Sequence, residues 1–358
     1  MVNKTANVIV FFQSSKYDRP IINTFLLYSP IQQFSAMKFP HKLSLKVAVL
    51  LLIFILSTDK IYCWGFFAHK QINKLAVFTL PPEMIKFYKS HIHYLSEHAV
   101  DPDKRRYVIP EEAARHFLDA DVYGDSAIYK LPRYWKQAKD YYSEDTLNAY
   151  GIVPWHIQRV AYNLTEAFKE KDGAAILKLS ADIGHYIADA NVPLHTTENY
   201  NGQLTNQVGI HGLWESRLPE LFTEDYDFFV GKAVFAENIQ LRAWSAVIQA
   251  HEALDSVFSF EKSVSLKFPE EKKYGYEDRG ATTVRVYSRD FSDSYHKLLK
   301  GQVERQMRAS IKMVGDIWYT CWLNAGQPDL SSLSAPIEEV LKSDDNVDPD
   351  SGSHRQVK

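Results

Sequence analysis

Apolar residues recur three and four positions apart along most of the chain, which is the pattern of helices that bury one face. The alternation typical of strands is scarce. The pattern predicts helices over residues 68–78, 82–96, 132–142, 155–170, 174–190, 209–222, 236–260 and 291–324. Residues 261–290 are mixed and charged, and we expect a long loop there with a short hairpin around residues 282–287. The sequence therefore predicts an all-α fold, organised as a single multi-helix domain over residues 64–328.

An uncharged apolar run, VAVLLLIFIL, occupies residues 47–56 and follows several basic residues. A membrane-spanning helix needs about twenty apolar residues, so this run is too short to be one. Its layout is that of a secretory signal peptide, which we place at residues 37–63, with cleavage before Trp64. The protein is then expected to be secreted or periplasmic; without cleavage the same run would act as a signal anchor.

Two further segments lie outside the helical pattern. Residues 1–36 precede the better signal-peptide start at Met37 and are expected to be an upstream extension. Residues 329–358 are rich in Ser, Asp and Pro, and we expect them to form a disordered tail. Neither segment enters the fold prediction.

The net charge argues against binding of a polyanion, and the cysteine content excludes stabilisation by an internal disulfide. Removal of residues 1–63 leaves 34 Lys and Arg against 42 Asp and Glu, a net charge of −8, which does not favour a binder of polyanions. The same cleavage leaves Cys321 as the only cysteine, so an intramolecular disulfide cannot stabilise the fold. Another kind of cross-link is expected.

The stretch GHYIADANVPLHTTENYNGQLTNQVGIHGLWES, residues 184–216, concentrates residues that bind metals. His185 and Asp189 are four apart on a predicted helix, so their side chains share a face. His195 follows the helix, and a second helix offers His211 and Glu215, again four apart. Imidazoles and carboxylates presented in this way suit zinc when thiolates are absent. One such pair arises easily by chance, but two pairs flanking a third His indicate a metal site.

Upstream, Asp101 follows one predicted helix and His116 ends another. Taken alone, Asp101 is a helix cap or a turn residue, and His116 is a surface histidine of an amphipathic helix. Their spacing does not connect them to the later cluster.

Together these elements resemble the zinc-dependent phospholipase C and S1/P1 nuclease superfamily, which consists of all-α enzymes that carry three zinc ions. The family pattern is present in order, in the segments WGFFAH, EHAVDPD, HFLD, HYIADANVPLH and HGLWE. The match extends from Trp64 to Glu215.

The resemblance implies three Zn²⁺ ions. One would be held by Asp101, His116, His185 and Asp189. A second would be held by His195, His211 and Glu215. The third would be held by the free amine and carbonyl of Trp64, by His69 and by a shared Asp189. Because a free α-amine exists only at a chain end, the third site depends on cleavage immediately before Trp64. Asp101 would also act in catalysis, by orienting the nucleophile or taking its proton.

The implied activity is zinc-dependent hydrolysis of phosphodiesters. Glu215 and the short segment between His195 and His211 favour phospholipase C-type action on a phospholipid or a small phosphodiester, with a transient contact with a membrane surface. The WGFFAH opening favours the alternative, a nuclease or 3′-nucleotidase acting on single-stranded nucleic acid. Phe117 is a candidate for substrate contact in either case.

A third possibility is a non-enzymatic binding module in which zinc only stabilises the fold. Such a module predicts closed sites with four protein ligands, whereas the second set has three and leaves a position open. The open position favours catalysis. Nothing in the sequence implies a stable protein partner.

Overall fold

The computed structural model describes residues 65–279 and 282–333, all within the second of two units into which the chain divides, Asp59–Lys358. The predicted extension, the signal peptide, Trp64 and residues 334–358 of the predicted tail lie outside the described residues. Inside that tail, Leu330 is described and is buried.

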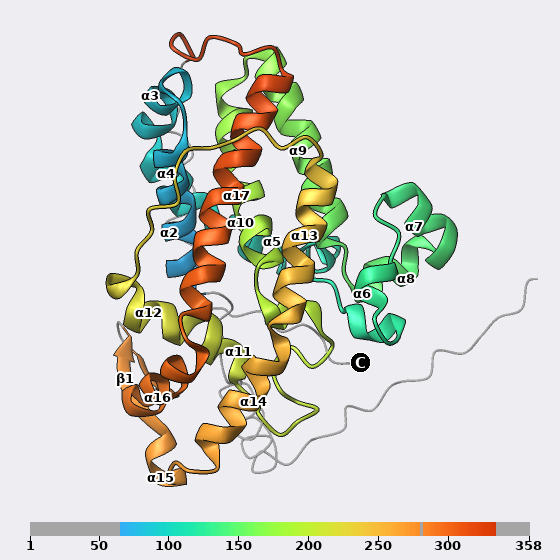
Figure 1. Ribbon diagram of the computed structural model, residues 1–358. Coiled ribbons are helices and arrows are strands. Elements are labelled where there is room, and N and C mark those ends of the chain that lie inside the picture. Colours follow the sequence, from blue (N-terminus) through green and yellow to red (C-terminus); the bar gives the residue numbers. More distant parts are fainter. Residues whose placement is uncertain (1–64, 280–281, 334–358) are drawn as a thin grey trace, which may run out of the picture. The chain divides into compact units, whose positions relative to one another are not determined.

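The described residues confirm the predicted all-α fold (Figure 1). The helices are α2 (Phe66–Ala76), α3 (Pro82–Ser90), α4 (Ile92–Glu97), α5 (Asp101–Arg105), α6 (Ala127–Lys130), α7 (Trp135–Tyr142), α8 (Glu144–Tyr150), α9 (Val153–Glu170), α10 (Gly173–Ala190), α11 (Ile210–Gly212), α12 (Leu218–Phe222), α13 (Ile239–Glu252), α14 (Leu254–Ser265), α15 (Glu270–Lys273), α16 (Arg289–Leu299) and α17 (Gln302–Asn324). Short 3₁₀ turns include η2 (His98–Val100), η3 (Pro110–His116) and η5 (Pro193–Thr196), and a π-helical turn, η6, spans Leu213–Arg217. Two strands, β1 (Tyr274–Arg279) and β2 (Thr282–Tyr287), pair as an antiparallel hairpin.

Three of the predicted helices are each divided in two. Residues 82–96 divide at His91, residues 236–260 at Ala253, and residues 291–324 at Lys300. The last break has a clear cause, because Lys300 and Gly301 have φ values of 50° and 75°, in the left-handed region. Apolar periodicity continues across such a break, so it cannot reveal one.

The predicted long loop over residues 261–290 is shorter than expected. Helix α14 continues to Ser265, α15 follows, and the predicted hairpin is present with Tyr274 paired to Tyr287. The buried carboxylate of Glu261 accepts hydrogen bonds from Gln207 and from Lys273, which lies directly before β1. These bonds hold the hairpin segment against the rest of the fold.

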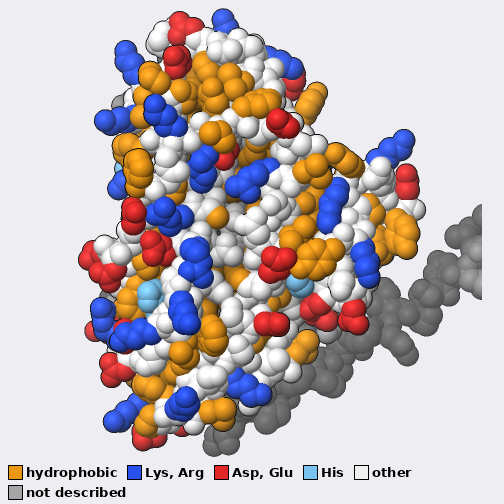
Figure 2. All heavy atoms as spheres, viewed as in Figure 1, with side chains coloured by type: hydrophobic (Ala, Val, Ile, Leu, Met, Phe, Trp, Pro, Cys, Tyr) orange, Lys and Arg blue, Asp and Glu red, His pale blue; other side chains and the backbone are white. Residues whose placement is uncertain are grey.

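The surface is of mixed charge. On the face shown in Figure 2, basic and acidic side chains are interspersed, with apolar side chains between them. No helix among the described residues combines the length and the apolar character needed to cross a bilayer.

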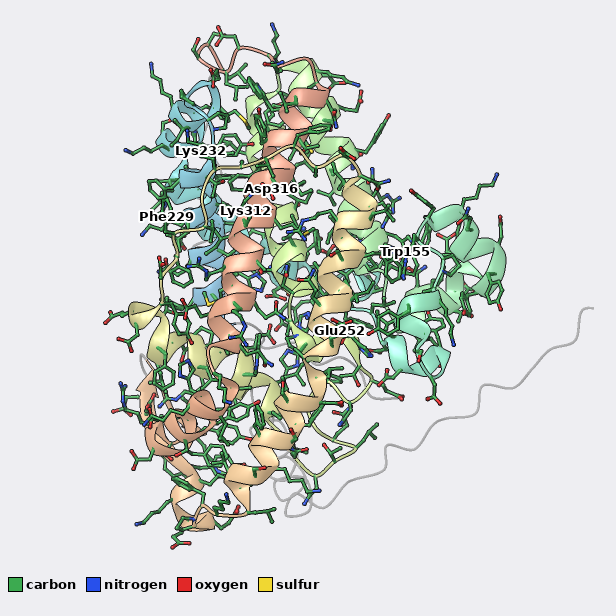
Figure 3. All side chains as sticks on the ribbon, in the orientation of Figure 1. Trp155, Phe229, Lys232, Glu252, Lys312 and Asp316 are labelled. Atoms are coloured by element: carbon green, nitrogen blue, oxygen red, sulfur yellow. The ribbon has the colours of Figure 1, made fainter. Side chains whose placement is uncertain are left out.

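An extended segment over residues 226–238 crosses α17 without forming a strand. Its backbone is held by α17 side chains: the N–H of Val234 donates to Asp316 at 2.8 Å, and that of Ala236 donates to Thr320 at 2.9 Å. Asp316 also pairs with Lys312 one turn earlier on α17 (Figure 3). Side chains of α17 therefore anchor the backbone of this segment.

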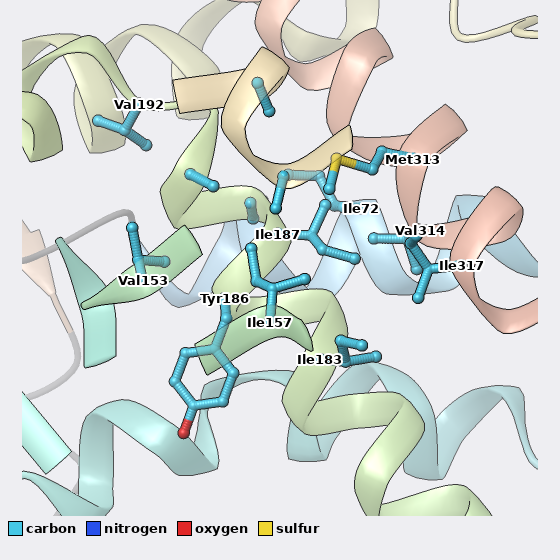
Figure 4. Close-up of a cluster of buried hydrophobic side chains, with 14 of the residues drawn as sticks. Ile72, Val153, Ile157, Ile183, Tyr186, Ile187, Val192, Met313, Val314 and Ile317 are labelled. Carbon is cyan, nitrogen blue, oxygen red and sulfur yellow. The ribbon is translucent and has the colours of Figure 1, made fainter. Parts of the chain in front are cut away.

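Helix α10 lies at the centre and is buried on every side from Ser180 to Ala190. It packs against α9, α17 and α2, and apolar side chains from all four helices meet around it (Figure 4). Its start is fixed by Asp172, whose Oδ1 accepts from the N–H of Ala175 at 3.0 Å. A helix that is buried all round must find internal partners for every polar side chain it carries.

Gly184 allows α2 to approach α10 closely. A Cβ at this position would lie 1.8 Å from Oδ1 of Asn73, whose amide donates to the carbonyls of Leu95 and Ala181. The absence of a side chain at residue 184 therefore sets the distance between α10 and the helix that carries His69.

We expect Gly184→Ala to lower the free energy of unfolding by about 2 kcal/mol, because the added methyl must displace Asn73 or separate the two helices. For a domain of this size the melting temperature should fall by roughly 4–8 °C, measured by calorimetry. Gly275→Ala is the control, because its added Cβ meets nothing within 4 Å. Equal stability of the two variants would contradict the close approach.

Candidate metal centre

The side chains of one buried centre come from six parts of the fold. His185 and Asp189 lie on α10, His69 on α2, Asp103 on α5 and His116 at the end of η3. The remaining three side chains come from η5 and from the α11–η6 segment, and they are His195, His211 and Glu215. Every one of these residues is at least nine-tenths buried. They form three groups in which the ligand atoms lie within 4.8 Å of one another.

The first group joins Asp103, His116 and His185, with Asp189 beside them. Nδ1 of His116 lies 2.8 Å from Oδ2 of Asp189, and Nε2 of His185 lies 3.2 Å from the same oxygen. The two ring nitrogens are 3.0 Å apart, and Oδ1 of Asp103 lies 3.7 Å from His185 and 3.8 Å from His116. The carboxylates of Asp103 and Asp189 therefore both lie beside the two histidines.

The second group consists of His195, His211 and Glu215. The Nε2 atoms of the two histidines lie 3.2 Å apart. Oε1 of Glu215 lies 3.5 Å from Nε2 of His195, and Oε2 is in direct contact with Nε2 of His211. The π-helical turn carries Glu215, and such turns are frequent at functional sites.

The third group consists of His69, His185 and Asp189, so it shares His185 with the first group. The rings of His69 and His185 stack with centroids 4.0 Å apart, and Nε2 of His69 lies 3.5 Å from Oδ1 of Asp189. The two oxygens of Asp189 thus face different groups. Trp64, the other predicted ligand here, lies outside the described residues.

Backbone carbonyls fix the orientation of two of the rings. Nδ1 of His185 lies 2.8 Å from the carbonyl of Ala99, and Nδ1 of His195 lies 2.9 Å from the carbonyl of His116. A carbonyl only accepts, so both Nδ1 atoms carry a proton. In the neutral rings, Nε2 is left with its lone pair directed at the cluster, which is how metal-binding histidines are usually held.

Burial and neighbouring charges shift the pKa values of several of these side chains in opposite directions. Burial, and then the charge of His185, lower the pKa of His69 to about 3. Burial would also lower the pKa of His185, but the Asp189 and Asp103 carboxylates raise it to about 9. Burial raises the pKa of the Asp103 carboxyl, with His185 opposing it. A proton on His185 therefore balances the carboxylates, and a metal would have to displace that proton.

The carboxylates of Asp189 and Glu215 remain ionised despite burial. Burial alone would raise the pKa of Asp189, but His185 and His195 hold it well below its usual range. For Glu215, burial is again outweighed, and His211 and His195 lower its pKa to about 2. The centre is therefore rich in anionic oxygens that lie against imidazole nitrogens.

The arrangement of these ligand atoms suits a divalent metal ion. Nitrogen ligands around a tetrahedral zinc, each about 2.0–2.1 Å from the ion, lie about 3.3 Å from one another. The nitrogen–nitrogen distances of 3.0 and 3.2 Å in the first two groups are close to that value. In addition, Oδ2 of Asp103 is buried with no hydrogen-bond partner among the described residues. Buried polar atoms are rarely left so, and a cation would satisfy it.

The structure places Asp103, and not the predicted Asp101, beside the histidines of the centre. Asp101 lies away from the histidines of the centre and accepts from Nδ1 of His98 at 2.5 Å and from Nζ of Lys104 at 3.1 Å. Asp103 instead lies beside His116 and His185. Residues two apart on a helix point in nearly opposite directions, so Asp-Pro-Asp offers two carboxylates of which one faces inward. The sequence alone does not show which one.

Glu112 is a second residue that the sequence analysis missed. Its fully buried carboxylate accepts from Tyr186 and Arg115, and its Oε1 lies 3.8 Å from Nε2 of His116. This contact lies on the side of the ring opposite to Asp189. Glu112 precedes His116 by four residues, the spacing of His185 with Asp189, so the sequence did contain a signal.

Phe117 is placed differently from its predicted role. Its side chain is only 6% exposed, and its carbonyl accepts from the N–H of Val153 at 3.2 Å. The ring packs against the backbone at Gly151, where an added Cβ would lie 2.5 Å from the ring. Phe117 is therefore buried against the backbone at Gly151.

Comparisons with known proteins give few matches. No protein-family model matches the chain, and no curated protein matches its sequence. The solved structures that are similar to it include the alpha-toxin of Clostridium absonum and the alpha-toxin of an avian strain of Clostridium perfringens. Both align with a TM-score of 0.43 over 76% of this chain and 66% of the toxin, at 11% and 15% identity respectively. The chain therefore spans just under two thirds of the length of these toxins.

We expect chelation of bound metal to lower the melting temperature by about 10 °C or more, because the centre joins α2, α5, α10 and the α11–η6 segment. Thermal unfolding should be followed with and without a chelator, and zinc should restore the lost stability where magnesium does not. An unchanged melting temperature in metal-free protein would contradict a metal centre.

A pair of substitutions distinguishes the roles of the Asp101 and Asp103 carboxylates. Asp103→Asn should weaken zinc binding at least about tenfold, because it removes an anionic oxygen from the first group. Asp101→Asn should leave zinc binding unchanged, since it alters only the contact with His98 and Lys104. Competition with a chromophoric chelator measures both affinities. The reverse order would restore Asp101 as the ligand.

Proposed function

We propose that the protein is a zinc-dependent phosphodiesterase that acts on a phospholipid or a small phosphodiester. The observation that carries this proposal is that the three ligand groups adjoin: His185 belongs to the first and third groups, and Asp189 of the third group lies beside His116 of the first and His195 of the second. Metals gathered in one site suit phosphodiesters, since they neutralise the anionic oxygens and lower the pKa of bound water.

The residues of the chain have separate tasks in this proposal. Asp189 is the common ligand, because one oxygen faces His116 and His185 and the other faces His69. The carbonyls of Ala99 and His116 hold the rings of His185 and His195 in the tautomer that binds metal. His195, His211 and Glu215 supply three ligands and leave a fourth position for substrate or water.

Asp103 replaces Asp101 as the proposed catalytic carboxylate. Its Oδ1 faces the first group, while Oδ2 has no hydrogen-bond partner among the described residues. Burial raises its pKa, so it is a stronger base than an exposed carboxylate. Asp103 is therefore positioned to orient an attacking water molecule and to accept its proton.

One observation supports the lipid or small-phosphodiester substrate over a nucleic acid. Phe117, the candidate for stacking on a base, is buried. Nuclease activity is the alternative outcome of the test below.

The test is turnover by zinc-loaded protein of phosphatidylcholine, a soluble aryl phosphodiester and single-stranded DNA. We expect the first two to be hydrolysed faster than DNA, and His185→Ala to lower kcat at least about 1000-fold. His93→Ala, at an exposed position on α4, is the matched control and should keep full activity.

Each other result has a defined meaning. Faster turnover of DNA would replace the proposal with the nuclease, and activity that survives in His185→Ala would remove the metal mechanism. Stoichiometric zinc without turnover of any ester would indicate the non-enzymatic module.

A further inference from the structure

The chain between Asp103 and His116 leaves the metal centre and returns to it. Both ends are fixed there, so the middle of this segment turns at the surface nearby. The turn is tight: the N–H groups of Val108 and Ile109 both donate to the carbonyl of Arg105, at 3.0 and 2.8 Å, and Glu112 donates to the carbonyl of Ile109. Five residues in helical or 3₁₀ geometry cover roughly 10 Å, so Val108 lies about that far from Asp103.

The tip of this segment is apolar and exposed. Tyr107, Val108 and Ile109, which we call the apolar turn, are 49%, 79% and 36% exposed. Single exposed apolar residues are ordinary on protein surfaces, but three in succession on a rigid turn indicate a contact surface. Tyr150, on a helix that packs against η3, adds a further exposed aromatic ring.

The charges at the base of the apolar turn are sorted by depth. The side chains of Lys104, Arg105 and Arg115 are 40%, 24% and 26% exposed. The carboxylates that pair with the two arginines, Glu112 and Asp182, are only 0% and 11% exposed. The carboxylates that pair with the two arginines therefore lie deeper than the cations, although Glu111 is exposed and Asp101, the partner of Lys104, is 24% exposed. An apolar tip with cations behind it is complementary to a bilayer interface, where phosphates lie outside the acyl chains.

We propose that the apolar turn inserts into the surface of a phospholipid bilayer, with Lys104, Arg105 and Arg115 against lipid phosphates. This inference rests on the proposed function, since insertion of the apolar turn would bring the metal centre close to its lipid substrate. Tyrosine is favoured at such interfaces because its ring is apolar and its hydroxyl remains hydrated.

The experiment is sedimentation of the protein with vesicles of phosphatidylcholine, with and without phosphatidylserine. Binding should increase with the anionic lipid and weaken with salt, because the cations contribute. Val108→Asp should weaken vesicle binding about tenfold or more. Leu266→Asp is the matched control, because Leu266 is also 79% exposed but lies after α14.

Measurements of turnover distinguish a failure of the docking surface from a failure of the proposed function. Val108→Asp should reduce hydrolysis of vesicle phospholipid but leave turnover of a soluble aryl phosphodiester and the zinc content unchanged. An unmodified protein that does not bind vesicles, or equal loss in Leu266→Asp, would overturn the docking surface even if the soluble ester is hydrolysed. Vesicle binding that depends on Val108 without turnover of any ester would retain the docking surface and refute the enzyme.

Discussion

One buried carboxylate, that of Asp189, holds the centre together. Its Oδ2 lies against the imidazoles of His116 and His185, and its Oδ1 faces His69 and His195. These histidines come from four separate elements, and the carboxylate is the atom group that all four share. Because α10 is buried on every side from Ser180 to Ala190, the position of Asp189 is set by packing on every side.

This placement has an energetic cost that the rest of the fold must offset. An isolated carboxylate in an apolar interior is strongly disfavoured, and the centre contains Asp103, Asp189 and Glu215 together. The imidazoles offset part of the charge, as the raised pKa of His185 shows. Bound cations would offset more of it. They would also cross-link the fold, which a disulfide does not do among the described residues, because Cys321 is a free thiol.

Sequence periodicity and residue spacing predicted much of this arrangement, for reasons that also explain the errors. His185 with Asp189, and His211 with Glu215, were found because four-residue spacing on a helix is a local property. Asp101 was chosen over Asp103 because the inward side of a short helix depends on what packs against it. Phe117 was expected near substrate because it adjoins His116, but adjacent residues in an extended backbone point to opposite sides. The helix breaks at His91, Ala253 and Lys300 were missed because apolar spacing continues through them.

The π-helical turn that carries Glu215 is also tied to the hairpin. Two residues after Glu215, the buried guanidinium of Arg217 donates to Oε2 of Glu277 on β1 at 2.8 Å and to the carbonyl of Tyr287 on β2 at 3.1 Å. The β1–β2 hairpin, the only pair of strands among the described residues, thus holds the backbone next to the proposed ligand Glu215 in place. A peripheral hairpin of this kind offers a way to adjust one part of the centre by small changes at the surface, without altering the helices that hold Asp189.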